Sequence, residues 1–544
     1  MGTGRLEETG KLFRPAVIMS RCFLLWSLAL LVQAPAVRAD DIDDLAGRVD
    51  RLIEQRLLAE TVTAAPVAGD AEFLRRVYLD LGGRIPPASR VRQFLAETAA
   101  DKRRRVVDEL LDSSLYVMHF STVWRKALLP ETQSDPQTRV LVPGFEAWLR
   151  QKLSEDTSYS AMVREIVTVS LAPAGVAGEL SRPGNRPSPL AFYQAKQIKP
   201  ENLAASMSRT FLGIRIECAQ CHDHPFDKWK QDEFWSFAAF FAGMERQGQG
   251  GFLAAIREVS ERRELEIPGT GRSVRPVHLD GAKFGPARGG GTRRLLADWM
   301  ISDRNPYFAR AAVNRLWAHQ FGIGLVDPPD DFTADNPPSH ARVLELLATE
   351  FVVHGFDVRF ILRAIAATKA YQRTSRRTHP SQSNLRLFSR MAVRGLSPEQ
   401  IYDSLAQAVG HVPSPSDRQP AVPGQSETPR DRVLELFRDE SSRPTQKRTT
   451  ILQALALMNS DFTADATSVD RSRTLAAVVG IPGLTTGDRI EALYLVTLGR
   501  RPRVEELKRL AGYVDGGGAT GDRRQALGDI FWALLNSSEF LLNH

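Results

Sequence analysis

Apolar residues along most of the chain recur every three or four positions, which is the period of amphipathic α-helices. Helix ends are marked as well: Ser397-Pro-Glu-Gln400 is a capping box that opens a helix, and Gly410 is placed to end it. Similar patterns predict further helices at residues 41–59, 102–112, 116–128, 202–212, 232–241, 305–321, 488–498, 504–514 and 522–542. The predicted fold class is therefore predominantly all-α.

Two packed helical domains are expected, because 544 residues are many for a single core. A Gly- and Pro-rich connection separates them, and an alternating stretch within it can form a short β-hairpin. The Pro- and Ser-rich segment within the second domain is expected to be a mobile loop. The predicted parts are an N-terminal helix at residues 40–69, a first domain at 70–244, the connection at 245–290, a second domain at 291–544 and the loop at 412–430.

The amino terminus has the features of an export signal at residues 1–39. Basic residues precede an eleven-residue apolar run, Cys22 to Val32, and small residues precede a cleavage point near Asp40. The run is short for a membrane span, so no transmembrane anchor is expected after cleavage. Either Met1 or Met19 can be the start. The predicted location is outside the cytoplasm, in the periplasm or cell envelope.

Charge argues against a nucleic-acid partner. Removing residues 1–39 takes away five basic and two acidic side chains, which lowers the formal net charge from +7 to +4. No basic stripe with interleaved aromatic residues accompanies this modest excess. The sequence also lacks a nucleophile elbow, a P-loop, a H-E-x-x-H motif and a dinucleotide fingerprint, and it therefore assigns no reaction.

The strongest chemical signal is C-x-x-C-H, formed by Cys218, Cys221 and His222. Two thiols at this spacing can attach to the two vinyl groups of one haem, and the adjacent histidine can then bind the iron. An alternative is a zinc or other metal site that also uses His224, although structural zinc sites usually join two separated ligand pairs. A local disulfide is a third interpretation, but redox C-x-x-C motifs follow a strand, whereas this neighbourhood is predicted to be helical.

The sixth ligand of such a haem is left open. His224 is too close to His222 to reach the opposite face of the same haem easily, so we expect a surface or hydrogen-bonding histidine. Met207 and Met244 are candidates by residue type, although methionine commonly fills cores. Three phenylalanines share one face of the predicted 232–241 helix, where they can form either a haem edge or ordinary core: Phe234, Phe237 and Phe241.

The residues around this motif resemble a known family. Glu217-Cys-Ala-Gln-Cys-His-Asp-His-Pro-Phe-Asp-Lys-Trp229, followed by an aromatic helix, closely resembles the planctomycete-type cytochrome-like domain, whose role is uncharacterised. Gly322-Ile-Gly-Leu-Val-Asp-Pro-Pro-Asp-Asp-Phe332 and the final residues to His544 resemble its companion C-terminal domain. Together the resemblances cover most of residues 70–544, and they imply no established substrate.

A second candidate site lies in the second domain, where polar residues gather on one predicted helix and in the acidic, Pro-rich loop after it. Its residues are Asn314, Arg315, His319, Asp330, Asp331 and His340. With residues that follow the cysteines, namely Asp223, His224, Asp227 and Lys228, several of these are predicted to line one cleft between the domains. Interdomain hydrogen bonds and salt bridges are the alternative.

The sequence thus predicts an exported cytochrome-like protein that binds one covalent haem c for electron transfer or redox sensing. Other envelope or redox proteins are the expected partners. The alternative is a structural or interaction protein of the envelope, with zinc or no cofactor, whose Cys/His motif is a metal knuckle or a local disulfide.

Overall fold

The computed structural model describes Met1 and residues 39–171, 187–247, 255–259, 261–281, 291–411, 428–438, 444–446, 450–459 and 461–544. Apart from Met1, these residues belong to one compact unit, Val37–His544. The predicted export signal, except for its first and last residues, lies outside the described residues, as do residues 412–427 of the predicted loop.

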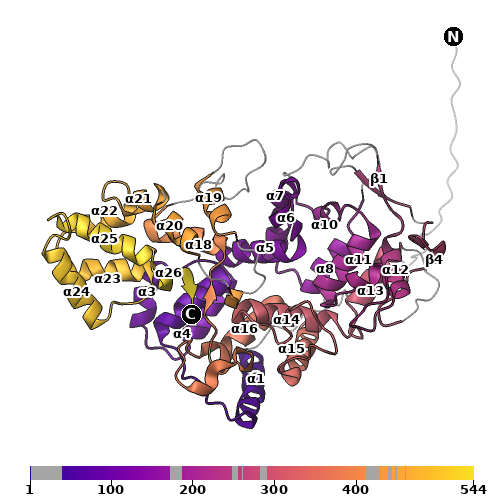
Figure 1. Cartoon of the computed structure of the whole chain (residues 1–544), viewed down its shortest axis with the longest axis horizontal. Coiled ribbons are helices and arrows are strands. Elements are labelled where there is room, and N and C mark those ends of the chain that lie inside the picture. The colour runs from indigo at the N-terminus through magenta and orange to yellow at the C-terminus, as the bar shows by residue number, and fades with distance from the viewer. Residues whose placement is uncertain are drawn as a thin grey trace. The chain divides into compact units, whose positions relative to one another are not determined.

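Short helices joined by turns make up most of the described chain (Figure 1). Up to the C-x-x-C-H motif the elements are α1 (Ala39–Ala59), α2 (Asp70–Val77), the π-helical turn η1 (Tyr78–Gly82), α3 (Ala88–Ala96), α4 (Lys102–Leu111), α5 (Ser114–Leu128), α6 (Glu131–Ser134), η2 (Pro136–Leu141), α7 (Val142–Ser154), α8 (Tyr159–Val167), α10 (Ala191–Ala195), α11 (Pro200–Met207) and the π-helical turn η3 (Ser208–Leu212).

The chain continues through the motif and into the second predicted domain. The elements are η4 (Glu217–Gln220), α12 (Gln231–Ala238), η5 (Ala239–Phe241), α13 (Thr292–Met300), α14 (Phe308–Phe321), α15 (Ala341–Val353), α16 (Val358–Ala367), α17 (Lys369–Gln372), η7 (Pro380–Ser383), η8 (Leu385–Leu387), α18 (Pro398–Val409), α19 (Pro429–Leu436), η10 (Pro444–Gln446), α20 (Ile451–Met458), α21 (Asp461–Thr467), α22 (Arg473–Gly480), α23 (Thr486–Thr497), α24 (Val504–Asp515), α25 (Arg523–Leu535) and α26 (Ser538–Leu541).

Strands are few and short among the described residues, where they form three antiparallel pairs. The pairs are β1 (Met244–Gln247) with β2 (Ala255–Glu258), β3 (Leu265–Ile267) with β4 (Arg272–Val274), and β5 (Arg394–Gly395) with β6 (Leu542–Asn543). The predominantly all-α prediction is confirmed. The β3–β4 hairpin lies within the predicted connection, as the alternating pattern indicated.

Capping residues correctly predicted both ends of α18. The Ser397 hydroxyl accepts a hydrogen bond from the Gln400 amide at 3.2 Å, and Gly410 ends α18 with a φ of 73°. The single helix predicted at 522–542 is wrong, because α25 ends before Asn536 and the Ser537 side chain caps a new helix. None of the described helices has the length and apolar character needed to span a membrane.

The apolar core forms two clusters. The larger cluster runs from α1 to Met391, also contains Leu495 on α23, and includes side chains from both sides of the predicted 245–290 connection. The smaller cluster packs α18 and the helices after it against Leu79 and Ile85 near the start of the first predicted domain. Packing therefore links the two predicted domains along most of their length, and their division at 245–290 stays a prediction.

One buried carboxylate joins segments that are far apart in the sequence. The side chain of Asp80, in η1, is almost completely buried and accepts hydrogen bonds from Tyr371 Oη at 2.7 Å, Asn543 Nδ2 at 2.7 Å and Arg394 Nη2 at 3.0 Å. Together these donors offset the cost of burying the negative charge of the Asp80 carboxylate. The Asp80 side chain therefore fixes α17 and both strands of the β5–β6 pair to η1.

Two neighbouring arginines hold the carboxyl end of the chain. Arg75 donates to the carbonyl of Phe540 at 2.8 Å and to that of Thr497 at 3.1 Å. Arg76 donates to the carbonyl of Arg373 at 2.9 Å and to that of His544 at 3.2 Å. Both guanidinium groups are buried. The carbonyl oxygens therefore replace the water molecules to which the guanidinium groups would donate in the unfolded chain.

Replacing Asp80 tests how much of the stability depends on this network. We expect Asp80→Ala to lower the free energy of unfolding by about 3–5 kcal/mol, because it leaves the buried Arg394 guanidinium without its counter-charge. Chemical denaturation followed by circular dichroism measures the change. Asp298→Ala is the matched control, since Asp298 pairs with Arg164 at an exposed site, where such pairs contribute about 0–1 kcal/mol. Equal losses in the two variants would contradict the role given to Asp80.

Candidate functional site

The cysteines of the C-x-x-C-H motif are accessible. Cys218 lies in η4 and Cys221 directly follows it; both thiols are free and exposed. His222 is also exposed, and its Nδ1 lies 2.7 Å from the backbone oxygen of Asp223. A carbonyl oxygen only accepts, so Nδ1 donates its hydrogen to it, and in the neutral ring the lone pair is then on Nε2. Two free thiols and one imidazole lone pair are therefore presented together at the surface.

Helix α12 holds the backbone of this motif. Gln231 Nε2 donates to the carbonyl of Cys221 at 2.9 Å, and Trp235 Nε1 donates to the carbonyl of Gln220 at 2.9 Å. The Asp223 carboxylate accepts from the Gln231 amide and from Lys230 Nζ, both at 3.0 Å, and these bonds lower the pKa of Asp223. The motif turn is thus ordered by its contacts with the start of α12.

His224 forms hydrogen bonds through both its ring and its backbone. Its Nδ1 accepts from the Phe226 amide at 3.2 Å, and its own amide donates to the carbonyl of Trp229 at 2.8 Å. Lys228 lies over the Trp229 ring at 4.7 Å, whereas the Phe226 side chain is 82% exposed. Within the described part of the chain, no three His, Cys, Asp or Glu side chains form a group arranged to hold a metal ion.

The aromatic residues after the motif form core. Phe234, Phe237 and Phe241 are fully buried in the larger apolar cluster. Met207 and Met244, left open as axial ligands, are buried in the same cluster. The ordinary packing role is therefore the one that the structure supports for all five side chains.

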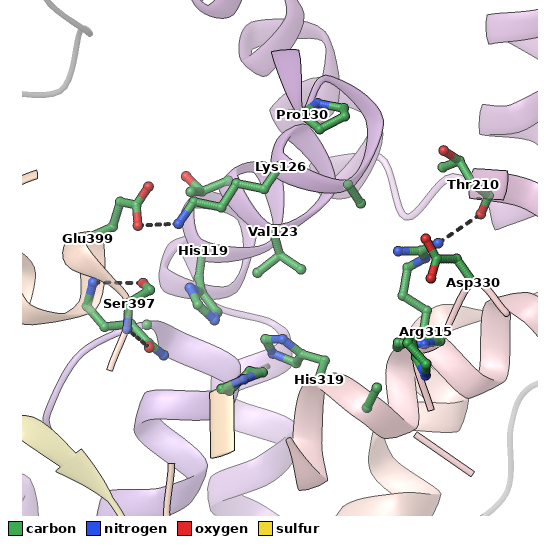
Figure 2. Close-up of a pocket in the computed structure, with 18 of the residues that line it drawn as sticks. His119, Val123, Lys126, Pro130, Thr210, Arg315, His319, Asp330, Ser397 and Glu399 are labelled. Atoms are coloured by element: carbon green, nitrogen blue, oxygen red, sulfur yellow. Dashed lines mark hydrogen bonds and ion pairs between the residues drawn. The ribbon is translucent and has the colours of Figure 1, made fainter. Parts of the chain in front are cut away.

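A cavity of about 990 Å³ lies elsewhere in this unit, between α5, α14 and the start of α18. Figure 2 shows His119 and Lys126 on α5, opposite His319 and Arg315 on α14. The two π-helical turns η1 and η3 and the loop around Asp330 complete its wall. Its size is within the range of small-molecule sites.

The two π-helical turns position the α14 side chains in the same way. Each turn is five residues long and ends at a glycine in the left-handed region, Gly83 with φ 72° and Gly213 with φ 70°. The carbonyl of the third residue in each turn accepts from α14: Asp80 O from His319 Nε2 at 2.8 Å, and Thr210 O from an Arg315 Nη at 3.1 Å. π-Helical turns are frequent at functional sites, and here they orient two side chains four residues apart on one helix face.

Two histidines meet at one end of the cavity. The ring centroids of His119 and His319 are 5.5 Å apart. Burial lowers the pKa of His119 to about 3 and also lowers the pKa of His319, with each ring surrounded by protein. Burial thus favours the neutral form of both imidazoles, in which one ring nitrogen of each can accept a hydrogen bond.

Ion pairs line the rest of the cavity. Lys126 Nζ lies 2.5 Å from the Glu399 carboxylate, and Arg125 Nη2 lies 3.5 Å from it. Burial alone would raise the pKa of Glu399, but the two cations outweigh it and hold this pKa well below its usual range. Asp330 is shared by Arg209 and Arg215 in the same manner, and its pKa is also lowered although burial opposes the shift.

The remaining second-domain candidates have supporting positions. Asn314 is buried and bonds both the amide and the carbonyl of Val326, at 3.0 and 2.9 Å, which holds the acidic loop against α14. Asp331 lies 4.0 Å from Arg215 Nε, at the edge of the same loop. His340 packs against the Phe388 ring, and burial lowers its pKa to about 4. Neither Asn314, Asp331 nor His340 lines the cavity.

The predicted shared cleft is only partly present. Arg315, His319 and Asp330 line the cavity, whereas the residues after the cysteines do not: Asp223, His224, Asp227 and Lys228. Glu217, the residue directly before the motif, does line the cavity, where it lies 3.6 Å from Arg209. Sequence patterns did not indicate His119 or Lys126, because both lie on an ordinary amphipathic helix without a motif. Glu399 lies within the capping box at Ser397, a pattern that predicts a helix start and not a site.

The Lys126–Glu399 pair predicts a pH-dependent stability. Because the folded state lowers the pKa of Glu399, its stabilising contribution is present above the unfolded-state pKa of about 4.3 and is lost as pH falls below it. We expect Glu399→Gln to be less stable than the native protein by about 1–3 kcal/mol at pH 7, with the difference shrinking as pH falls below about 4. Thermal unfolding at several pH values measures this.

The control for this experiment is Glu345→Gln, which alters a carboxylate paired with Arg310 at an exposed site. A stability difference for Glu399→Gln that stayed constant from pH 7 to pH 3 would contradict the lowered pKa.

Comparison with protein families identifies two domains in the chain. Residues 48–246 match PSCyt2, a protein of unknown function (DUF1549). Residues 292–444 and 425–514 match PSD1, a protein of unknown function (DUF1553). No curated protein and no solved structure matches the chain.

Proposed function

From the premise that the chain belongs to the family in which a PSCyt2 domain precedes a PSD1 domain, we propose that it is an exported protein carrying one covalent c-type haem. The observation that carries the proposal is the arrangement of Cys218, Cys221 and His222: two free, exposed thiols beside an imidazole whose Nδ1 is hydrogen-bonded to the Asp223 carbonyl. Its role is electron transfer or redox sensing, with envelope redox proteins as partners.

The residues of the motif fit the chemistry of haem attachment. Cys218 and Cys221 would hold the group through two thioether bonds, and His222 would bind the iron through Nε2. The Nδ1 contact with the Asp223 carbonyl supports this assignment, because a metal-binding histidine usually donates its other ring hydrogen to a fixed acceptor. When bound, a haem supplies one-electron chemistry.

Features around the motif also suit an accessible cofactor. The contacts from Gln231 and Trp235 keep the backbone of the turn in place without covering the thiols. Phe226 offers an exposed apolar side chain in the same loop, which could cover part of a haem edge. An export signal at residues 1–39 would bring the cysteines to the compartment in which such haems are attached.

A spectroscopic experiment tests the proposal. We expect the full chain, produced with a c-type maturation system, to show a Soret band and to keep haem staining on a denaturing gel. Cys218→Ser with Cys221→Ser should lose the staining, because no thioether can form. Ser236→Ala is the control, since Ser236 lies on α12 outside the motif, and it should keep the staining.

Two other outcomes would overturn the haem proposal. Absence of both the Soret band and the staining, together with one equivalent of zinc by elemental analysis, would favour a metal knuckle. The same absence with no alkylatable thiol before reduction would favour a local disulfide between Cys218 and Cys221. Either result would instead support a structural or interaction protein.

A further inference from the structure

Charged side chains of both signs line the cavity. Glu399 lies beside Arg125 and Lys126, and Asp330 lies beside Arg209 and Arg215. Arg125 also pairs with Glu146 at 2.9 Å, and Arg209 lies 3.6 Å from Glu217. The cations at these two positions are therefore matched by carboxylates.

Arg315 adds a cation with no carboxylate of its own. One Nη of Arg315 donates to the Thr210 carbonyl at 3.1 Å, but its Nε is buried and has no hydrogen-bond partner. No ion pair joins Arg315 to a carboxylate of the described residues. A buried N–H donor usually has a hydrogen-bond partner. A carboxylate or phosphate group can supply one, because two of its oxygens match the paired N–H groups of a guanidinium.

The histidine end of the cavity offers polar atoms without charge. His119 Nε2 is buried and has no partner, and His319 Nδ1 carries the lone pair because its Nε2 donates to Asp80. These nitrogens can bond hydroxyl groups of a ligand whose charged end is at Arg315. Figure 2 shows His319 and Arg315 on the same side of α14, with His119 across from them.

We propose that this cavity binds a small polar organic anion, with its carboxylate or phosphate group at Arg315 and its uncharged polar end between His119 and His319. The described residues that line the cavity include no Phe, Tyr or Trp, and the proposed contacts are therefore those of charged and polar groups. This assignment is independent of the haem, because the cysteines do not line the cavity.

Titration calorimetry with matched anionic and neutral probes tests the site. Citrate and glucose 6-phosphate are the anions, and trimethyl citrate and glucose are their neutral analogues, all measured at constant ionic strength so that general screening is equal. We expect at least one anion to bind in the millimolar range or more tightly, and its neutral analogue to bind at least tenfold more weakly. Which anion binds distinguishes a carboxylate site from a phosphate site.

Variants on α14 then locate the bound charge. Arg315→Met should weaken binding of that anion about tenfold or more, because it removes a charged hydrogen-bond donor. Arg310→Met is the matched control on the same helix, where Arg310 pairs with Glu345 at the surface, and it should leave the affinity unchanged. If Arg315→Met does not fold, Arg315→Lys, which keeps the charge, should weaken binding by a smaller factor.

Three results would overturn the proposal. They are no binding of either anion, equal binding of an anion and its neutral analogue, and equal losses of affinity in the Arg315 and Arg310 variants. The same titration on the Cys218→Ser, Cys221→Ser protein separates the two proposals. Unchanged anion binding in that protein is expected, whether or not the native chain carries a haem.

Discussion

The buried carboxylate of Asp80 is the interaction on which the rest of the described structure depends. Its side chain binds Tyr371, Arg394 and Asn543, so three distant segments are fixed to one π-helical turn. Its backbone carbonyl accepts from His319 and thereby sets one wall of the cavity. A buried charge needs all of its partners in place, and this requirement couples the core to the cavity.

The π-helical turns explain how a helical fold can build a polar cavity. An ordinary α-helix uses its interior carbonyls for its own hydrogen bonds and leaves few for other side chains. The wider turns at η1 and η3 each present a carbonyl to α14, and a left-handed glycine then redirects the chain. The repeated arrangement places an imidazole and a guanidinium on one face of a single helix.

The motif and the cavity are separate features that meet at one position. Glu217 reaches the cavity wall near Arg209, while Cys218 follows it in the exposed η4 turn. Short-range contacts with α12 maintain the motif, whereas the cavity needs helices that are far apart in the sequence. The proposed haem and the proposed anion site can therefore be altered independently of one another.

The sequence by itself determined the features that depend on nearby residues: the helical fold class, the capping box at Ser397 and the C-x-x-C-H spacing. Apolar periodicity and helix caps depend on residues a few positions apart, so helices and their ends can be predicted from a short stretch of sequence. Tertiary structure alone decided that His119 faces His319, that Glu399 pairs with Lys126, and that Asn314 only supports a loop. These contacts join residues that are more than ten positions apart, and their partners are set by packing.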